Sequence, residues 1–163
     1  MLFRSLRILS LLVVAVCVSA CGFRLQGAFV APPGMERTYI ESSDRYSQFH
    51  RAFETELRRA GVEISDTAAD ATAIFTLFSD DTAQRVLSVS ARNVPTEYEV
   101  YYTITYRLDL GATTLLPQQT LTRTRNYTYD STLVLGKARE EELLREAIVN
   151  DLVRIIMKQI TTL

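Results

Sequence analysis

The sequence contains no tryptophan, one histidine, two cysteines and six glycines in 163 residues, a length that fits one domain. The cysteines, Cys17 and Cys21, both lie near the N-terminus, which excludes a zinc site or a framework of two disulfides. Each glycine stands alone, so neither a glycine-rich phosphate loop nor a nucleophile elbow is present. Eighteen basic residues balance nineteen acidic ones, which leaves no excess positive charge for binding nucleic acid.

The first 20 residues have the order of a bacterial secretion signal. Arg4 and Arg7 are the only charged residues in the segment 1–7, residues 8–18 are almost wholly apolar, and small residues follow. The apolar segment is about 11 residues long, well below the roughly 20 that a membrane-spanning helix needs. We therefore predict a signal peptide over residues 1–20 that is removed, and a single domain over residues 21–163.

The end of this segment, Val18-Ser19-Ala20-Cys21, resembles the lipobox of bacterial lipoproteins. In that class the cysteine is acylated and cleavage occurs just before it, so the resemblance implies an N-acyl diglyceride lipid on Cys21. Two or more acyl chains form a stable anchor where one chain is marginal. Gly22 stands where aspartate would retain a lipoprotein in the inner membrane, which implies the periplasmic side of the outer membrane. The alternative is an ordinary signal peptide with an unmodified cysteine.

The domain is expected to contain two helices. The first begins at a cap formed by Ser43 or Asp44 and ends at Gly61. Its apolar face has spacings of three and four, and comprises Tyr46, Phe49, Phe53, Leu57 and Ala60. The second helix is expected over residues 137–160, with Glu140, Glu141 and Glu142 in its first turn, where the helix dipole favours acidic side chains.

Strands are predicted over residues 22–27, 38–41, 62–64, 73–78, 85–91, 98–110 and 118–129. The clearest alternation lies in 98–110, where Val100, Tyr102, Ile104, Tyr106 and Leu108 share one face. Because strands and helices do not alternate through the middle of the chain, the pattern favours an α+β fold with both helices on one face of a mainly antiparallel sheet.

No set of residues has the pattern of an active site. His50 lies beside the apolar face of the first helix and is interpreted as structural. The neighbouring acids Asp80 and Asp81 are expected in a solvated turn at the end of a strand, because two adjacent carboxylates are weak evidence for a cation site. We predict that the protein is not an enzyme and holds no metal or other cofactor.

Two features remain as candidate binding surfaces. The first is a group of tyrosines on two strands expected to pair, of which one or two are expected at an interface: Tyr98, Tyr101, Tyr102, Tyr106, Tyr127 and Tyr129. The second is a set of basic residues able to bind phosphate: Arg85, Arg92, Arg123, Arg125 and Lys137. Within that set, Arg92 lies at a hairpin end and Lys137 at a helix start.

Several short segments together resemble the LptE family of outer-membrane lipopolysaccharide-assembly lipoproteins. They are residues 21–27, residues 54–63, the pairs Arg92-Asn93 and Glu97-Tyr98, and Leu135-Gly136-Lys137. The resemblance implies two helices against a four-stranded sheet. It also implies a protein that plugs the lumen of the LptD β-barrel, helps that barrel assemble and contacts lipopolysaccharide during its insertion into the outer leaflet. Arg92 and Lys137 then become the candidate residues for the phosphorylated lipid headgroup.

Two other functions stay open at this point. A periplasmic pilot or ligand-binding lipoprotein of another envelope secretion system would have the same anchor without the barrel. An envelope hydrolase would need a nucleophile and a base, which the sequence does not provide.

Overall fold

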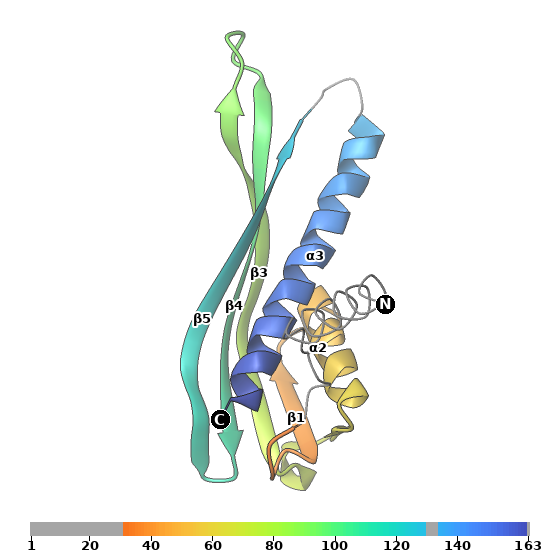
Figure 1. The fold of residues 1–163 in the computed structure, drawn as a ribbon, viewed down its shortest axis with the longest axis vertical. Helices are drawn as coiled ribbons and strands as arrows, with labels where there is room; N and C mark the ends of the chain where they lie inside the picture. Colours follow the sequence, from red (N-terminus) through yellow and green to blue (C-terminus); the bar gives the residue numbers. More distant parts are fainter. Residues whose placement is uncertain (1–30, 130–133, 163) are drawn as a thin grey trace, which may run out of the picture.

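A computed structural model describes residues 31–129 and 134–162, apart from the side chains of residues 134–137. The helices and strands are β1 (Arg37–Ser42), α2 (Gln48–Arg59), β2 (Glu63–Ile64), β3 (Ala73–Val89), β4 (Pro95–Leu110), β5 (Thr113–Thr128) and α3 (Val134–Thr161), with a short 3₁₀ turn at Ala68–Asp70 (Figure 1). The strand predicted over residues 22–27 lies outside the described residues.

The strands form one sheet in the order β2-β1-β3-β4-β5. The long pairings of β3 with β4 and of β4 with β5 are antiparallel, whereas β1 runs parallel to both of its neighbours. The expected number of four strands is wrong, because β2 adds a short fifth strand at one edge. Gly61, at a φ of 82°, turns the chain after α2, and Glu63 then donates a backbone hydrogen bond of 2.9 Å to Glu36.

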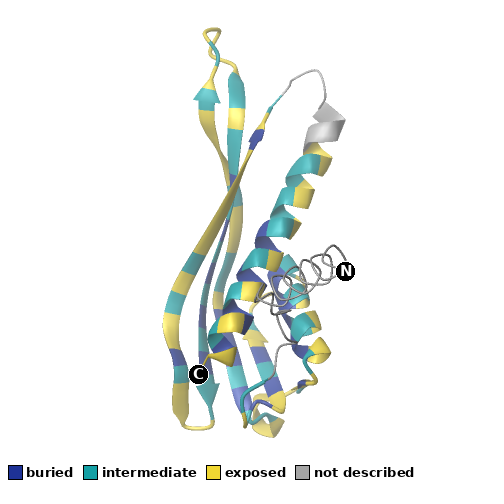
Figure 2. Cartoon of the chain, in the orientation of Figure 1, coloured by how far each residue is buried: buried dark blue, intermediate teal, exposed yellow. Residues whose placement is uncertain are grey.

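Both helices lie on the same face of the sheet, as the sequence predicts (Figure 1). The even-numbered residues of β4 from Val100 to Leu108 point toward them and are buried. Figure 2 shows buried residues on the sheet and helix surfaces that face each other, and exposed residues along β5. Tyr106 donates a hydrogen bond from this core to Gln159 of α3, and burial raises the pKa of its hydroxyl to about 12.

Strand β3 is longer than expected, and the turn predicted at Asp80 and Asp81 is wrong. Both residues lie within β3 and pair with β4, after a register shift between Leu77 and Ser79. Asp80 accepts a hydrogen bond from the Tyr102 hydroxyl, so an acidic residue is tolerated inside the sheet. This bond and burial raise the pKa of Tyr102, with burial the larger cause.

Helix α2 begins later than expected. Its N-cap is Ser47, whose hydroxyl accepts a 3.0 Å hydrogen bond from the backbone of His50. The expected cap Asp44 instead forms a turn, in which its carboxylate accepts a hydrogen bond from Tyr46. Tyr46 therefore precedes the helix and is 85% exposed, not buried as predicted.

Helix α3 begins at Val134, three residues before the expected start. The expectation that Glu140, Glu141 and Glu142 occupy its first turn is therefore wrong. The helix includes Gly136, because a single glycine weakens a helix without ending it.

His50 packs into the core from α2 and is only 5% exposed. Its Nε2 lies 3.8 Å from a carboxylate oxygen of Glu54, and its Nδ1 is buried with no hydrogen-bond partner among the described residues. Burial lowers the pKa of the imidazole, and this outweighs the opposite effect of Glu54. The fold therefore holds His50 in its neutral form, in agreement with the interpretation that it is structural.

The Phe53→Ala variant tests the packing of α2 on the sheet. Phe53 is fully buried, with its ring centroid 4.3 Å from that of Phe75. We expect the free energy of unfolding to decrease by about 3–5 kcal/mol, measured by denaturant unfolding. Tyr46→Ala is the control and should change it by less than about 0.5 kcal/mol. Equal losses would contradict the assigned helix face.

The His50→Leu variant tests the neutral imidazole. Because the folded-state pKa lies below the usual 6.5, the stabilisation is complete above pH 6.5 and is lost as the pH falls through the lowered value. We expect the unfolding free energy of the unsubstituted protein to decrease between pH 7.5 and pH 5.5 more steeply than that of His50→Leu. Parallel pH profiles would show that His50 does not resist protonation.

Candidate functional site

The hairpin of β3 and β4 extends beyond the helices at one end of the molecule (Figure 1). Neither α2 nor α3 covers its tip, and four large apolar residues there are 44–53% exposed: Val86, Leu87, Val89 and Val94. Figure 2 also shows the tip as exposed or half-buried. We refer to residues 86–94 as the hairpin tip. Its apolar side chains face solvent instead of the core.

The tip turns through a hydrogen-bonded loop. Ser90 donates a backbone hydrogen bond of 2.8 Å to Val94, and Asn93 donates one of 2.9 Å to Ser90. Asn93 has a φ of 59°, a left-handed conformation that asparagine adopts more readily than most residues. Below the turn, the hydroxyls of Ser88 and Thr96 are 2.8 Å apart. These bonds order the backbone that carries Arg92.

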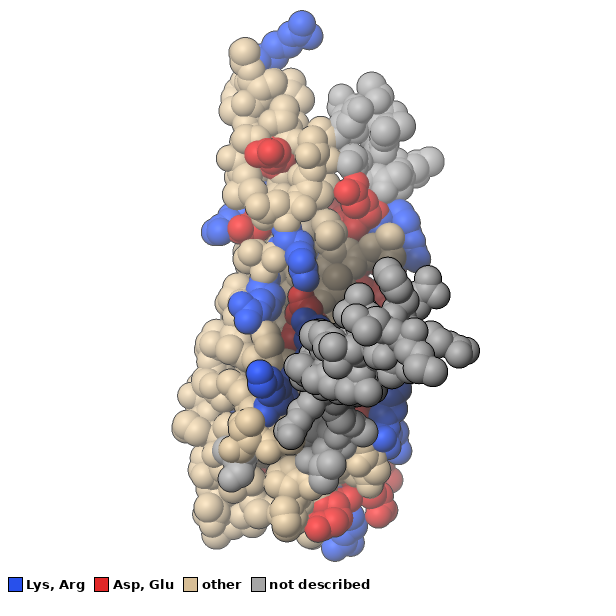
Figure 3. Space-filling view, viewed as in Figure 1, with Lys and Arg blue, Asp and Glu red and all other residues tan. Residues whose placement is uncertain are grey.

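Arg92 lies in this turn and is exposed. No ion pair or hydrogen bond to its guanidinium occurs among residues 31–129 and 138–162. Figure 3 shows basic charge at the free end of the hairpin. The hairpin tip therefore combines a cation able to bind phosphate through two hydrogen bonds with apolar side chains able to contact hydrocarbon.

Lys137 lies in the first turn of α3, and its side chain is outside the described part of the structure. The beginning of α3 and the hairpin tip lie toward the same end of the long axis (Figure 1). The fold thus brings the two candidate residues to one end of the molecule, although they are far apart in sequence. Cys21 lies outside the described residues.

The remaining basic candidates do not join Arg92 in one cluster. Arg85 pairs with Glu99 at 2.5 Å, and its guanidinium lies 5.9 Å from the ring centroid of Tyr101. Arg125 pairs with Asp151 of α3. Arg123 is exposed on β5. The predicted basic set is therefore divided among the hairpin tip, the sheet and the first turn of α3.

Most of the six tyrosines are part of the internal packing, in agreement with the expectation that only one or two lie at an interface. Tyr102 and Tyr106 are in the core. Tyr98 stacks on Tyr127 at a centroid distance of 5.7 Å and meets Tyr129 edge-on at 5.3 Å. Tyr127 also donates a 3.0 Å hydrogen bond to Gln84. This cluster joins β4 to β5 near the hairpin tip.

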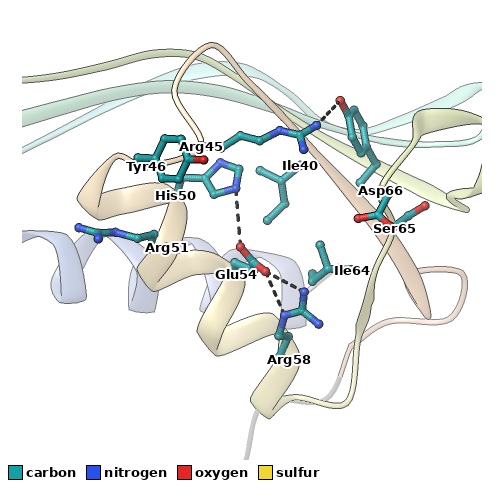
Figure 4. A pocket seen from close by; sticks show the side chains of 11 residues that line it. Ile40, Arg45, Tyr46, His50, Arg51, Glu54, Arg58, Ile64, Ser65 and Asp66 are labelled. Atoms are coloured by element: carbon teal, nitrogen blue, oxygen red, sulfur yellow. Dashed lines mark hydrogen bonds and ion pairs between the residues drawn. The ribbon is translucent and has the colours of Figure 1, made fainter.

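A groove of about 330 Å³ lies between α2 and the edge formed by β1 and β2 (Figure 4). Arg58 donates hydrogen bonds of 3.0 and 2.8 Å to Glu54, and Arg45 donates one of 3.3 Å to the hydroxyl of Tyr39. His50 also lines the groove, with its Nε2 toward Glu54. These contacts satisfy much of the polar lining within the protein itself.

In residues 31–129 and 134–162 we find no helix that is both long and apolar enough to cross a bilayer. The same part of the chain contains no group of three or more metal-binding side chains.

The sequence did not predict the exposed apolar character of the hairpin tip. A signal is visible in the adjacent pair Val86 and Leu87, since neighbouring residues of a strand cannot both face one core. The sequence alone does not show that this pair is exposed, because the exposure depends on where the helices end along the sheet.

Comparisons with known proteins agree on one family. The model of the family LptE, described as lipopolysaccharide-assembly, matches residues 35–160. The chain is 33% identical over 149 residues to the LPS-assembly lipoprotein LptE of Yersinia enterocolitica, which covers 86% of this chain and 69% of the relative.

Two solved structures are similar to the whole fold. The solution structure of lipoprotein B from Nitrosomonas europaea has a TM-score of 0.71 at 26% identity, covering 86% of this chain and 90% of that one. The crystal structure of rare lipoprotein B from Shewanella oneidensis has a TM-score of 0.67 at 25% identity. The match covers 77% of this chain and 94% of that one. With a family model that matches most of the domain and a relative above 30% identity, the chain belongs to the LptE family.

Proposed function

We propose that this protein is an outer-membrane lipoprotein that plugs the LptD β-barrel, helps the barrel assemble, and contacts lipopolysaccharide during its insertion into the outer leaflet. A lipid on Cys21 anchors the mature chain, residues 21–163, on the periplasmic side. The observation that carries the proposal is the LptE family match over residues 35–160. Members of this family are lipopolysaccharide-assembly lipoproteins and not enzymes, and they need no cofactor.

The surface of the domain is suited to a polar lumen. Ion pairs at its surface include Arg58–Glu54 at 2.8 Å, Arg85–Glu99 at 2.5 Å, Arg107–Asp109 at 2.6 Å and Arg154–Asp151 at 2.6 Å. The sheet face away from the helices carries threonines whose hydroxyls bond to one another, such as Thr103 with Thr122 at 2.9 Å. The interior of a large transmembrane barrel is polar, so a compact domain with balanced charge can fill it.

The hairpin tip is suited to a phosphorylated lipid. Arg92 can bind a phosphate through its planar guanidinium, while Val89 and Val94 beside it can contact acyl chains. Lys137, in the first turn of α3, is the second candidate for this contact. The proposed lipopolysaccharide contact therefore involves both elements.

The alternative, a pilot or ligand-binding lipoprotein of another secretion system, also fits an anchored domain without catalytic residues. It differs in its partner, since the chain would co-purify with a secretion ring or without any barrel.

Depletion of the protein in its own bacterium tests the main proposal. We expect the LptD barrel to misfold or to carry wrong disulfides, and lipopolysaccharide to stall below the cell surface. Barrel folding can be followed by non-reducing electrophoresis, and surface lipopolysaccharide by its accessibility in intact cells. Normal surface lipopolysaccharide after full depletion would contradict the proposal.

The double variant Arg92→Glu with Lys137→Glu tests the lipid contact. We expect the affinity for purified lipopolysaccharide to fall by about tenfold or more, because charge-assisted phosphate contacts are lost. Barrel association and the unfolding free energy should stay the same. Arg51→Glu is the matched control, an exposed arginine on α2 away from the tip. Unchanged affinity of the double variant for lipopolysaccharide would show that neither residue contacts the lipid.

A further inference from the structure

The outer edge of β5 is an open strand edge. In the sheet order β2-β1-β3-β4-β5, this strand is terminal and pairs only with β4. Helix α3 packs against β5, but from one face of the sheet, so that no described helix or strand covers the edge itself (Figure 1). Backbone groups that point away from β4 therefore meet no strand of the described chain.

One hydrogen bond shows which residues these are. The backbone N–H of Tyr129 donates a hydrogen bond of 2.8 Å to the carbonyl oxygen of Thr96. The backbone N–H and C=O of Tyr129 therefore point toward β4. Pairing is continuous from Tyr106 with Gln119 to Glu97 with Thr128, and amide direction alternates along a strand. The outward groups therefore belong to Thr120, Thr122, Thr124, Asn126 and Thr128.

This edge lacks two of the features by which proteins block strand addition. Between Gln119 and Thr128 there is no proline, and the register shifts of the β4–β5 pairing lie outside this segment, although the strand carries the charged residues Arg123 and Arg125. The outward residues are mostly threonines, which favour extended structure. A long regular edge of this kind can accept another extended segment by main-chain hydrogen bonds.

The side chains indicate what kind of strand would fit. On the face away from the helices, the hydroxyls of Thr120 and Thr122 each lie 2.9 Å from a threonine hydroxyl of β4. On the helix face, Arg125 pairs with Asp151, whereas Arg123 is exposed with no carboxylate bonded to it among the described side chains. An incoming strand with an acidic residue beside Arg123 would give this arginine an ion pair, as Asp151 does for Arg125.

A second copy of the chain is a poor fit for the same edge in the registers that bring Arg123 and Arg125 of the two copies together. Suppose that two β5 strands pair in an antiparallel sense with the pairing centred at residue 123, 124 or 125. Arg123 or Arg125 of one copy would then lie directly across from an arginine of the other copy. Like charges directly across a strand pair are destabilising. Charge therefore favours a different polypeptide.

We propose that the outer edge of β5 binds an extended segment of a partner protein by strand addition. The segment carries acidic side chains on the helix face and small hydroxyl side chains on the other face. This inference does not depend on the proposed barrel function, since it rests on the edge, its amide direction and its charge.

A synthetic nine-residue peptide of alternating threonine and glutamate, ending in threonine, is the probe. It is titrated to millimolar concentration into the isotope-labelled full chain, and amide hydrogen exchange is followed by NMR. We expect exchange at Thr120, Thr122 and Thr124 to slow by about tenfold, as each N–H gains a hydrogen bond. The inward amides of Leu121 and Arg123, already bonded to β4, should not change.

Two variants and a second peptide complete the test. Thr122→Pro removes one outward N–H without breaking the β4 ladder and should weaken binding by about tenfold, whereas Thr122→Val should bind normally. A threonine–lysine peptide should bind more weakly than the acidic one. The proposal is overturned if the acidic peptide gives no alternating protection, or if Thr122→Pro binds normally. It is equally overturned if the outward amides are protected without peptide in a concentration-dependent dimer.

Discussion

The fold depends on the packing of one face of β4 against the two helices. Val100, Ile104 and Leu108 point toward α2 and α3, and Tyr106 links the sheet to α3 through Gln159. Since apolar burial is the main favourable term in folding, this single face holds most of the domain together. It also leaves the opposite face, the β5 edge and the hairpin tip available for partners.

The hairpin tip follows from a difference in length between sheet and helices. Strands β3 and β4 continue past the end of the region that the helices cover, so Val86 and Val94 are exposed instead of packed. An exposed group of apolar residues promotes aggregation of an isolated protein unless a partner or a lipid covers it. Together with Arg92, they give the tip an amphipathic character.

Much of the fold could be predicted from the sequence, because periodicity reports which residues face a core. The alternation in β4 and the spacing of Phe49, Phe53 and Leu57 in α2 were sufficient for that purpose. The turn wrongly predicted at Asp80 and Asp81 has its cause in a hydrogen bond between distant residues, whereas the start of α2 is set by local bonds at Asp44 and Ser47. Tyr102 accommodates Asp80 inside β3, where sequence alone favoured a turn. The candidate Arg92 could be placed in a hairpin, but the apolar surface around it depends on where the helices stop. The β5 edge likewise became visible only from the strand order.

The central claim is that this lipid-anchored domain acts by occupying a larger partner. Native mass spectrometry of the complex gently extracted from the outer membrane tests it most directly. The account predicts one copy of the chain bound to one LptD barrel, with a mass that begins at an acylated Cys21. Recovery of the chain alone, or with an unmodified cysteine and no barrel, would contradict it.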